Sequence, residues 1–250
     1  MRAFGLSLIP LLSIVDLALS QTTGTVPQFR PALIGNGPKA LVNVINTKRL
    51  MEKGQRDGLV MFRCYVSRSG QPGGYYVGQR TLGIQVYRET PGAKLLKDEV
   101  EHAIISCRFI PAIDNGGRND VLFTGTVVFS VTDGKPHLRI YANQSRDDLK
   151  KGNDFIAPQV VASTVVWEGS KYDLAAQKAR VYRQKGAIEL SITVDANGNQ
   201  KDMKVILEDP PGFGLGTTAR DAYAKAKWIP GFRNGHAVEC TFDYAEFFGP

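Results

Sequence analysis

Apolar and polar residues alternate in the same way over two segments that lie far apart in the chain. Residues 58–70 and 186–198 each begin and end with glycine, and they align without gaps. Alternate apolar positions predict a half-buried β-strand in both segments. The closing Gly70 and Gly198, preceded by Ser and Asn, are typical of a hairpin turn because these residue types accept positive φ angles. The matched apolar residues are Val60, Phe62, Cys64 and Val66 in the first segment and Ile188, Leu190, Ile192 and Val194 in the second.

A second pair of matching segments lies downstream. Residues 109–116 and 228–235 both begin with an aromatic residue, Ile and Pro, and both end in Asn-Gly. An amphipathic helix is predicted before each, and a final strand after each, over residues 121–131 and 238–248. Because the matching blocks recur in one order, the chain is expected to contain a strand–turn–strand–helix–strand unit twice. The predicted helix faces are Leu96, Val100, Ala103, Ile104 and Cys107 in the first copy and Ala219, Ala222, Tyr223 and Ala226 in the second, with Thr217 or Thr218 as the expected cap of the second helix.

The first copy is longer than the second between its opening strand and its helix. The extra residues fall around 78–91 and predict a loop insertion, because surface loops tolerate added length. Between the copies, residues 137–143 alternate as a further strand and residues 146–154 predict a polar turn. Short helices are predicted over residues 49–53 and 173–184, one ahead of each copy.

The N-terminus has the pattern of a secretory signal. Arg2 precedes an apolar run over residues 3–14, and a small-x-small cleavage pattern follows immediately before Gln21. The alternative is a membrane anchor, which needs roughly 20 apolar residues, whereas this run is shorter and is interrupted by proline. We therefore expect residues 1–20 to be cleaved and the mature protein to be periplasmic, with no integral membrane span.

Composition is that of an ordinary globular protein. The 250 residues are 43% hydrophobic and 22% charged, which suits one large domain or two small ones. The net charge of +7 raises the question of nucleic-acid binding. Lysines and arginines are interrupted by acidic residues, however, and no basic stripe interleaved with aromatic residues occurs, so nucleic acid is not an expected partner.

The cysteines are the first candidates for chemistry. Cys64 is predicted on the inward face of a strand and Cys107 on the inward face of a helix, so packing of the helix on its own sheet could bring them together. In an oxidising compartment they could form a disulfide. The alternative, two buried free thiols that behave as small apolar residues, is nearly as consistent with the sequence. Cys240 is predicted to be a buried, unpaired thiol.

No catalytic or metal-binding constellation stands out. His102, His137 and His236 lack the spacing of metal ligands. Residues 195–199 imitate the start of a calcium loop but lack its Gly and its final carboxylate, so a turn is expected. The Gly-rich residues 212–216 lack the Gly-Lys-Ser/Thr of a phosphate loop. We therefore expect no cofactor, no metal and no enzymatic activity; the predicted module-core residues are Phe109, Pro111, Trp228 and Pro230.

The second copy resembles the C-terminal domain of TonB-type energy transducers. The ordered features are the alternating strand after Gly186, the Asn197-Gly198 turn, the Ala-spaced helix, the Trp228-Ile-Pro segment and the final strand. The resemblance implies a helix packed on an antiparallel sheet and a role in contacting outer-membrane transport proteins, for which strand addition is the usual device. The first copy carries the same features more loosely. A Pro-rich spacer and the opening Tyr-Pro pair of that family are absent, so energy transduction does not follow.

Together these patterns predict an α+β protein of two tandem TonB C-terminal-like modules, each an antiparallel sheet with a helix on one face. The expected function is a periplasmic protein-interaction module that docks an envelope protein, with a homodimer as a further expectation. The alternatives are a periplasmic enzyme with a site between the modules that uses His102 or His236, and a membrane-anchored transducer if the signal stays attached. The expected divisions are a signal peptide over 1–20, an extended lead-in over 21–45, a first module with an extra strand over 46–165 and a second module over 166–250.

Overall fold

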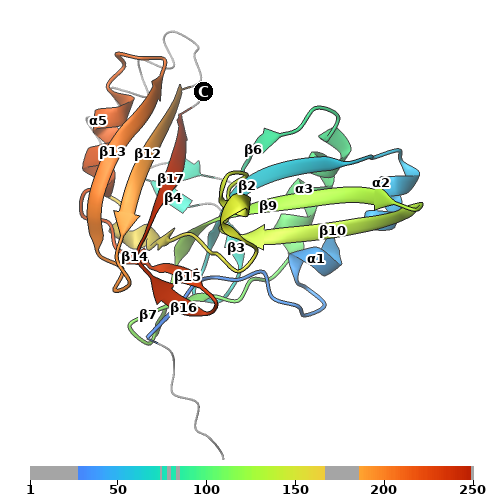
Figure 1. The fold of residues 1–250 in the computed structure, drawn as a ribbon, viewed down its shortest axis with the longest axis horizontal. Helices are drawn as coiled ribbons and strands as arrows, with labels where there is room; N and C mark the ends of the chain where they lie inside the picture. Colours follow the sequence, from blue (N-terminus) through green and yellow to red (C-terminus); the bar gives the residue numbers. More distant parts are fainter. Residues whose placement is uncertain (1–27, 74, 78–79, 83–84, 167–185, 249–250) are drawn as a thin grey trace, which may run out of the picture.

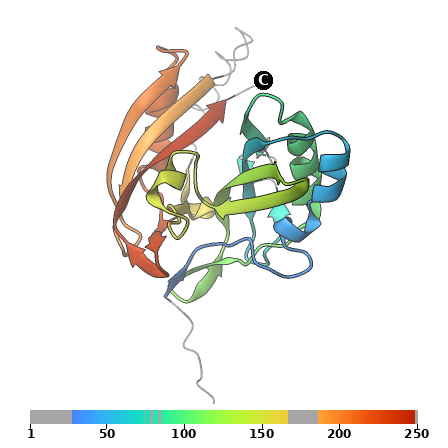
Figure 2. The ribbon, with the colours of Figure 1, turned by 45° about the vertical axis from the view of Figure 1, so that its right-hand side comes forward.

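Two antiparallel sheets stand side by side and are joined at one end (Figure 1, Figure 2). The computed structural model describes residues 28–73, 75–77, 80–82, 85–166 and 186–248. The predicted signal peptide, the first part of the lead-in and the predicted helix over 173–184 lie outside the described residues. We call residues 58–142 the N-terminal unit and residues 186–248 the C-terminal unit. The architecture is α+β, as the sequence predicted.

The sheet of the N-terminal unit is built around strand β2. Strand β9 pairs with one side of β2, and strands β3 and β6 pair with its other side. Strand β10 then pairs with the outer side of β9. Helix α3 packs on the sheet and buries its predicted face, with Cys107 as its C-cap residue. The bounds are β2 Gly58–Val66, β3 Pro72–Gly73, β6 Gln85–Glu89, α3 Lys94–Ser106, β9 Val121–Thr132 and β10 Lys135–Ala142.

The sheet of the C-terminal unit has the order β13-β12-β17, with helix α5 packed against it. Strand β12 shows strict alternation of buried and half-buried residues, which confirms the period seen in the sequence. A short hairpin, β15–β16, precedes β17. The bounds are β12 Gly186–Val194, β13 Gln200–Asp209, α5 Leu215–Tyr223, β15 Gly231–Arg233, β16 His236–Val238 and β17 Cys240–Phe248.

The two units place matching residues in matching registers. Cys64 of β2 pairs with Phe123 of β9, and the aligned Ile192 of β12 pairs with Phe242 of β17. The Asn-Gly turns before the last strand of each unit also share a conformation, with φ of 47° at Asn115 and 50° at Asn234. Both turns follow a short strand, β7 (Ala112–Asp114) in the first unit and β15 in the second. The matched elements therefore occur in the same order in both units.

A glycine contact recurs in both units as well. Gly70 and Gly198 have φ of +78° and +79°, and a Cβ at either position would lie 2.1 Å or 2.2 Å from a backbone oxygen. That oxygen belongs to Phe109 in the first unit and to Trp228 in the second. Both aromatic side chains are buried, at 5% and 1% exposure. Pro230 is buried and Pro111 is half-buried beside them.

The two units are interlocked through the residues that connect them. Strand β11 (Gln159–Val160) of the connector pairs with β14 (Trp228–Ile229) of the C-terminal unit. The side chain of Gln159 accepts from Ala32 N at 2.7 Å and donates to Ala32 O at 3.0 Å, which ties the connector to the N-terminal lead-in. Ile229 and Phe232 pack in the same apolar cluster as α3 and β9. The units thus share part of their core.

The structure differs from three sequence predictions. The insertion predicted as a loop around residues 78–91 contains the short strand β5, which pairs with β4 just before the insertion, and strand β6. The second helix begins at Leu215 after Gly214, so neither Thr217 nor Thr218 is its cap. The last strand begins at Cys240, because Val238 belongs to β16. The remaining elements are β1 Phe29–Arg30, α1 Leu41–Val44, α2 Thr47–Glu52, β4 Tyr75–Val77, β5 Arg80–Leu82, β8 Gly117–Asn119, η1 Asp148–Lys151 and η2 Ala162–Thr164.

Candidate functional site

Strand β17 ends the sheet of the C-terminal unit on the side that faces the N-terminal unit (Figure 1). Two of its backbone carbonyls accept hydrogen bonds from side chains outside the sheet. Arg63 Nη1 donates to Ala245 O at 3.1 Å, and Lys151 Nζ donates to Thr241 O at 3.2 Å. In an antiparallel strand the N–H and C=O of one residue point to the same side. The backbone groups of residues 241, 243 and 245 therefore face away from β12 and form the open edge of β17.

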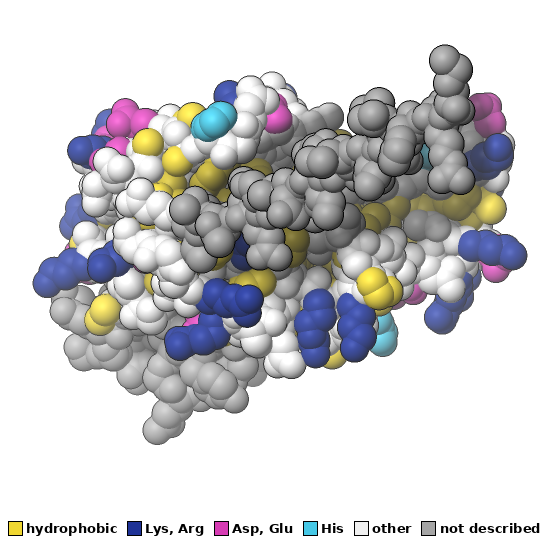
Figure 3. All heavy atoms as spheres, turned by 90° about the horizontal axis from the view of Figure 1, so that it is seen from below, with side chains coloured by type: hydrophobic (Ala, Val, Ile, Leu, Met, Phe, Trp, Pro, Cys, Tyr) yellow, Lys and Arg dark blue, Asp and Glu magenta, His cyan; other side chains and the backbone are white. Residues whose placement is uncertain are grey.

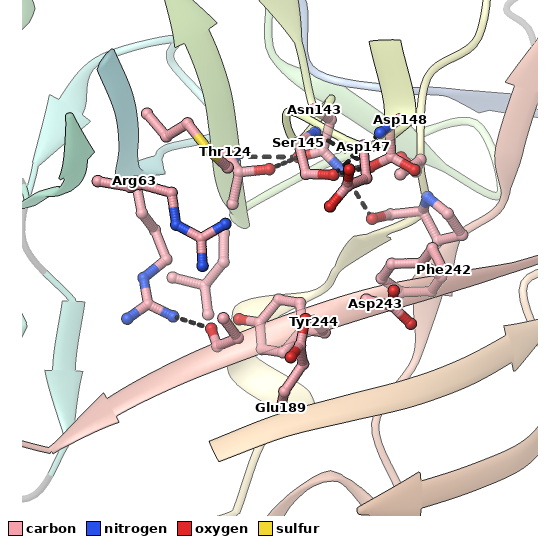
Figure 4. A pocket seen from close by; sticks show the side chains of 16 residues that line it. Arg63, Thr124, Asn143, Ser145, Asp147, Asp148, Glu189, Phe242, Asp243 and Tyr244 are labelled. Carbon is pink, nitrogen blue, oxygen red and sulfur yellow. Dashed lines mark hydrogen bonds between the residues drawn. The ribbon is translucent and has the colours of Figure 1, made fainter. Parts of the chain in front are cut away.

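A cleft lies along this edge, between the two units. It has a volume of about 70 Å³, which is room for a few water molecules or a small polar group. Figure 4 shows Arg63 on one wall, residues 143–148 on the opposite wall and β17 along the floor. Asp243 lies on the floor, between the two carbonyls that Arg63 and Lys151 already occupy. The cleft thus exposes the middle of the β17 edge; its charged lining residues are Arg63, Arg88, Asp147, Asp148, Glu189 and Asp243.

The floor of the cleft is anchored by a buried polar cluster. Arg63 Nη1 lies 3.0 Å from Glu246 Oε2, and these side chains are 8% and 4% exposed. Tyr223 O–H donates to the same carboxylate at 2.9 Å and contacts the Tyr244 hydroxyl at 3.1 Å. Burial, followed by the Glu246 charge, raises the pKa of Tyr223 well above its usual value and that of Tyr244 to about 12. Both phenols are therefore neutral, and the Tyr223 hydroxyl supports a buried ion pair between the units by donating to its carboxylate.

The outer face of β2 explains how an arginine becomes buried there. The middle of β2 is buried on both faces, including Met61 and Arg63 at 3% and 7% exposure. The aligned residues of β12, Glu189 and Ser191, are half-buried. The C-terminal unit covers the outer face of β2 through β17, whereas the outer face of β12 is only partly covered. Arg63 therefore reaches the β17 edge because its strand lies against the other unit.

The wall opposite Arg63 is a loop held by side-chain hydrogen bonds. Asn143 donates from its side chain to Ala157 O at 2.8 Å and to Pro158 O at 2.7 Å. Ser145 and Asp148 bond reciprocally, with each backbone N–H donating to the side chain of the other residue. Asp148 also lies 2.9 Å from Lys151 Nζ, the amine that bonds to β17. These bonds fix the Lys151 side chain over the strand edge.

In the N-terminal unit the equivalent edge is covered. Strand β9 corresponds to β17 by register. All residues of β10 pair with β9, over residues 125–132 of β9. Beyond β10, Asn143 N–H donates to Thr124 O at 2.7 Å, and Thr124 N–H donates to the Asn143 side chain at 3.0 Å. Thr124 is the counterpart of Asp243. The backbone groups that are open in the cleft are thus hydrogen-bonded in the first unit.

The candidate residues from the sequence are not part of the cleft. Cys64 and Cys107 are buried in one apolar cluster, and the structure holds them, like Cys240, as free thiols. Cys240 is half-buried and free, so its prediction as a buried thiol is wrong as to its burial. His102 and His236 do not line the cleft. Within the described part of the chain, no group of three or more His, Cys, Asp or Glu could hold a metal ion.

Two motifs that imitate ligand sites have structural explanations. The Asp195 carboxylate accepts from the backbone of Asn197 and from both the backbone and side chain of Asn199, which closes the hairpin turn. Glu208 accepts from the N–H groups of Leu215 and Gly216 at 3.1 Å and 3.3 Å. A carboxylate from β13 therefore occupies the N-terminus of α5, where a phosphate would have to bind.

Surface charge does not form a nucleic-acid footprint on the face that Figure 3 displays. There the Lys and Arg side chains lie in separate groups among neutral residues. Among the described residues, the ion pairs include several between neighbouring side chains, such as Lys94 with Asp98 at 3.0 Å. No helix in the described ranges is long and apolar enough to cross a membrane.

Comparison with known proteins finds a family model that matches the C-terminal part of the chain. Residues 176–247 match the family described as Gram-negative bacterial TonB protein C-terminal. The match begins ahead of β12 and ends within β17, so it includes the β17 edge and the α5 helix. No curated protein sequence matches the chain. The chain therefore carries, over residues 176–247, a domain similar to the C-terminal domain of TonB proteins.

Proposed function

We propose that this protein binds another protein of the cell envelope by adding an extended segment of that partner to the edge of β17. The observation that carries the proposal is the row of outward backbone groups at residues 241, 243 and 245, of which Asp243 and Ala245 line the cleft and none pairs with a described strand on that side. In strand addition the main chain supplies the hydrogen bonds and the flanking side chains supply specificity. The match of residues 176–247 to the TonB C-terminal family supports this kind of role.

The proposed architecture is two copies of one module, over residues 46–165 and 166–250. It is supported by the common strand registers, by the shared Asn-Gly turn conformation and by the twin glycine contacts at Phe109 and Trp228. On this proposal the first copy gained an extra strand, β10, and an insertion before β6. The second copy kept the open edge.

The proposed location is the periplasm, and the proposed partner is an outer-membrane or other envelope transport protein. The basic, apolar and small-residue pattern over residues 1–20 supports export and cleavage. Sequencing the N-terminus of the protein recovered from the periplasmic fraction should give Gln21 as the first residue. An intact Arg2 in the membrane fraction would instead favour an anchored transducer.

The proposed role is non-enzymatic. The alternative of an enzyme with a site between the modules relied on His102 or His236, and neither side chain lines the cleft. The cleft lining combines apolar residues with two arginines, four carboxylates, one amide and three hydroxyls, and it includes no histidine or cysteine. It offers hydrogen-bonding groups suited to a peptide main chain.

A second copy of the chain is proposed as a further partner at the opposite edge of the same sheet. Strand β13 is that edge, and Val205, Ile206 and Leu207 on it are 38–51% exposed. An exposed apolar edge strand favours pairing with another strand. Sedimentation velocity should show a dimer that Ile206→Lys reduces; a monomer at all concentrations would contradict the proposal.

The docking proposal is tested by site-specific photo-crosslinking in living cells. A photoreactive amino acid at Asp243 lies in the cleft, whereas the same amino acid at Ile105, which is 69% exposed on α3, is a matched control away from it. We expect a discrete adduct from position 243 and none from position 105. Mass spectrometry of the adduct should identify an extended segment of an envelope protein. The same adducts from both positions would refute docking at β17.

A further inference from the structure

The two sheets match in register, but they differ at two buried positions that meet across the cleft. Arg63 of β2 occupies the position that Ser191 occupies in β12. Glu246 of β17 pairs with Ile188, as Val127 of β9 pairs with the aligned Val60. A charge thus replaces a neutral residue once in each unit. The two charges lie 3.0 Å apart as a buried ion pair.

This pair holds the N-terminal unit against the backbone edge of β17. Arg63 Nη1 bonds to the Glu246 carboxylate and also to the carbonyl of Ala245. Buried ion pairs add little net stability compared with apolar residues, but removal of one partner is costly, so they fix one arrangement over others. The opposite charges of Arg63 and Glu246 are therefore better explained by the fixed arrangement that they give the two units than by a gain in stability.

We propose that Arg63 and Glu246 form a latch by which the N-terminal unit closes the β17 edge, so that a partner strand is admitted only when the latch opens. The inference rests on the proposed strand addition at β17. A strand that added to β17 would donate its N–H groups to the carbonyls of residues 241, 243 and 245. Lys151 and Arg63 occupy the first and last of these carbonyls, which leaves the carbonyl of Asp243 as the open one of the three. Neighbouring positions of this kind lie roughly 7 Å apart along a strand, so an extended segment must displace both side chains to pair with all three.

The alignment of the units supplies variants that open the latch without leaving a buried charge. Arg63→Ser introduces the residue of the equivalent β12 position, and Glu246→Val introduces the residue of the equivalent β9 position. The double variant R63S/E246V therefore keeps side chains that this fold already accommodates. Adding Lys151→Ala to the double variant removes the second side chain that bonds to a β17 carbonyl. Lys150→Ala is the matched control, because Lys150 forms its ion pair with Asp147 and not with β17.

The strand β10 provides a probe of defined sequence. A fluorescent peptide of residues 135–143 is the strand that pairs with β9, the counterpart of β17. In that pairing Asn143 and the alternate residues before it donate to β9. A peptide with Arg139→Pro and Tyr141→Pro lacks two of these donors and serves as the non-pairing control. Fluorescence anisotropy measures both peptides against the purified protein, and hydrogen exchange of β17 measures closure without any peptide.

Two expected results support the latch. The amides of β17 exchange at least tenfold faster in R63S/E246V/K151A than in the natural protein, while K150A is unchanged. The 135–143 peptide binds the triple variant at least tenfold more tightly than the natural protein, and the proline peptide binds neither. Equal exchange and equal peptide affinity in both proteins would overturn the latch and leave strand addition standing. Faster exchange with no peptide binding to the triple variant would instead overturn strand addition at β17, and the gating role with it.

Discussion

At the scale of single residues, a missing Cβ fixes the position of an aromatic core residue. The backbone of Gly198 has φ of +79° and touches the carbonyl oxygen of Trp228. Only glycine combines this conformation with this contact, because any side chain would bring a carbon to 2.2 Å from that oxygen. The hairpin turn thereby holds the segment that inserts Trp228 into the core.

Gly198→Ala should lower the free energy of unfolding by more than about 2 kcal/mol, since the strained φ and the backbone clash add together. Gly212→Ala is the matched control. It has a similar φ of +82° with nothing within 4 Å of the added Cβ. Gly212→Ala should lower the free energy of unfolding by about 1 kcal/mol, from the unfavourable backbone conformation alone. Urea unfolding curves of the two variants measure the difference, and equal losses would contradict a role for the contact.

The turn that imitates a calcium loop makes a pH-dependent contribution to stability. Hydrogen bonds from the Asn199 side chain and backbone lower the pKa of Asp195 to about 2. The folded pKa lies below the unfolded value of about 3.9, so the contribution is present above about pH 4 and is lost as the pH falls toward 2. Asp195→Ala should therefore be less stable than the natural protein at about pH 6, with the gap narrowing at about pH 3. A gap that widens on acidification would show the opposite sign of linkage.

The disulfide between Cys64 and Cys107 stays a prediction. Both side chains are buried in one cluster, and burial raises the pKa of the Cys64 thiol well above its usual value. Thiol titration of the unfolded, unreduced protein should give three free thiols for the structure described above. A single free thiol would show that the bridge forms in the oxidising compartment, where it would add about 3–4 kcal/mol of stability.

At the scale of elements, a carboxylate from one strand caps the helix that follows it. Glu208 near the end of β13 accepts from two N–H groups in the first turn of α5. Glu208→Ala should destabilise the protein by about 1 kcal/mol, and Glu208→Gln by less, since its amide oxygen still accepts. Asp202→Ala, on the exposed part of the same strand, should stay within about 0.5 kcal/mol. Thermal unfolding followed by circular dichroism compares the three; equal effects of Glu208→Ala and Asp202→Ala would rule out capping.

The strands and helices could be predicted from the sequence because the apolar pattern of each element lies within its own residues. Alternation in residues 58–66 and 186–194 and the spacing of α3 follow from which face each element buries. The cap of α5 could not be predicted in this way, because the capping group comes from another strand. Thr218 instead donates its hydroxyl to Gly214 O, inside the helix.

The cleft could not be predicted from local sequence patterns either. Arg63 stands at an outward position of an alternating strand, which normally means solvent. Arg63 is buried only because the C-terminal unit covers that face. This contact can be inferred only when Arg63 and Glu246, which lie in different units, are considered together. The one local signal is Met61, an apolar residue at the outward position where β12 has Glu189.

At the scale of the whole molecule, the units share a core and should unfold together. Phe232 of the C-terminal unit packs in the cluster that contains α3 and β9. Phe232→Ala should cost about 3–5 kcal/mol and should weaken the hydrogen-exchange protection of β9 and β12 in parallel. Ile105→Ala, an exposed position, should leave both unchanged. Loss of protection confined to β12 would show that the units are energetically independent.

The strand β10 has a consequence for how many partners one molecule can hold. A duplicated module would ordinarily double the valency of a binder and allow it to cross-link two receptors with avidity. Here β10 already completes the sheet of the first unit through its pairing with β9. A partner strand that binds at the edge equivalent to β9 would therefore find that edge open only in the C-terminal unit, beside β17, and titration with such a partner would saturate at an equimolar ratio. On the proposed duplication, the first unit acts as a companion domain to a single binding edge in the second unit.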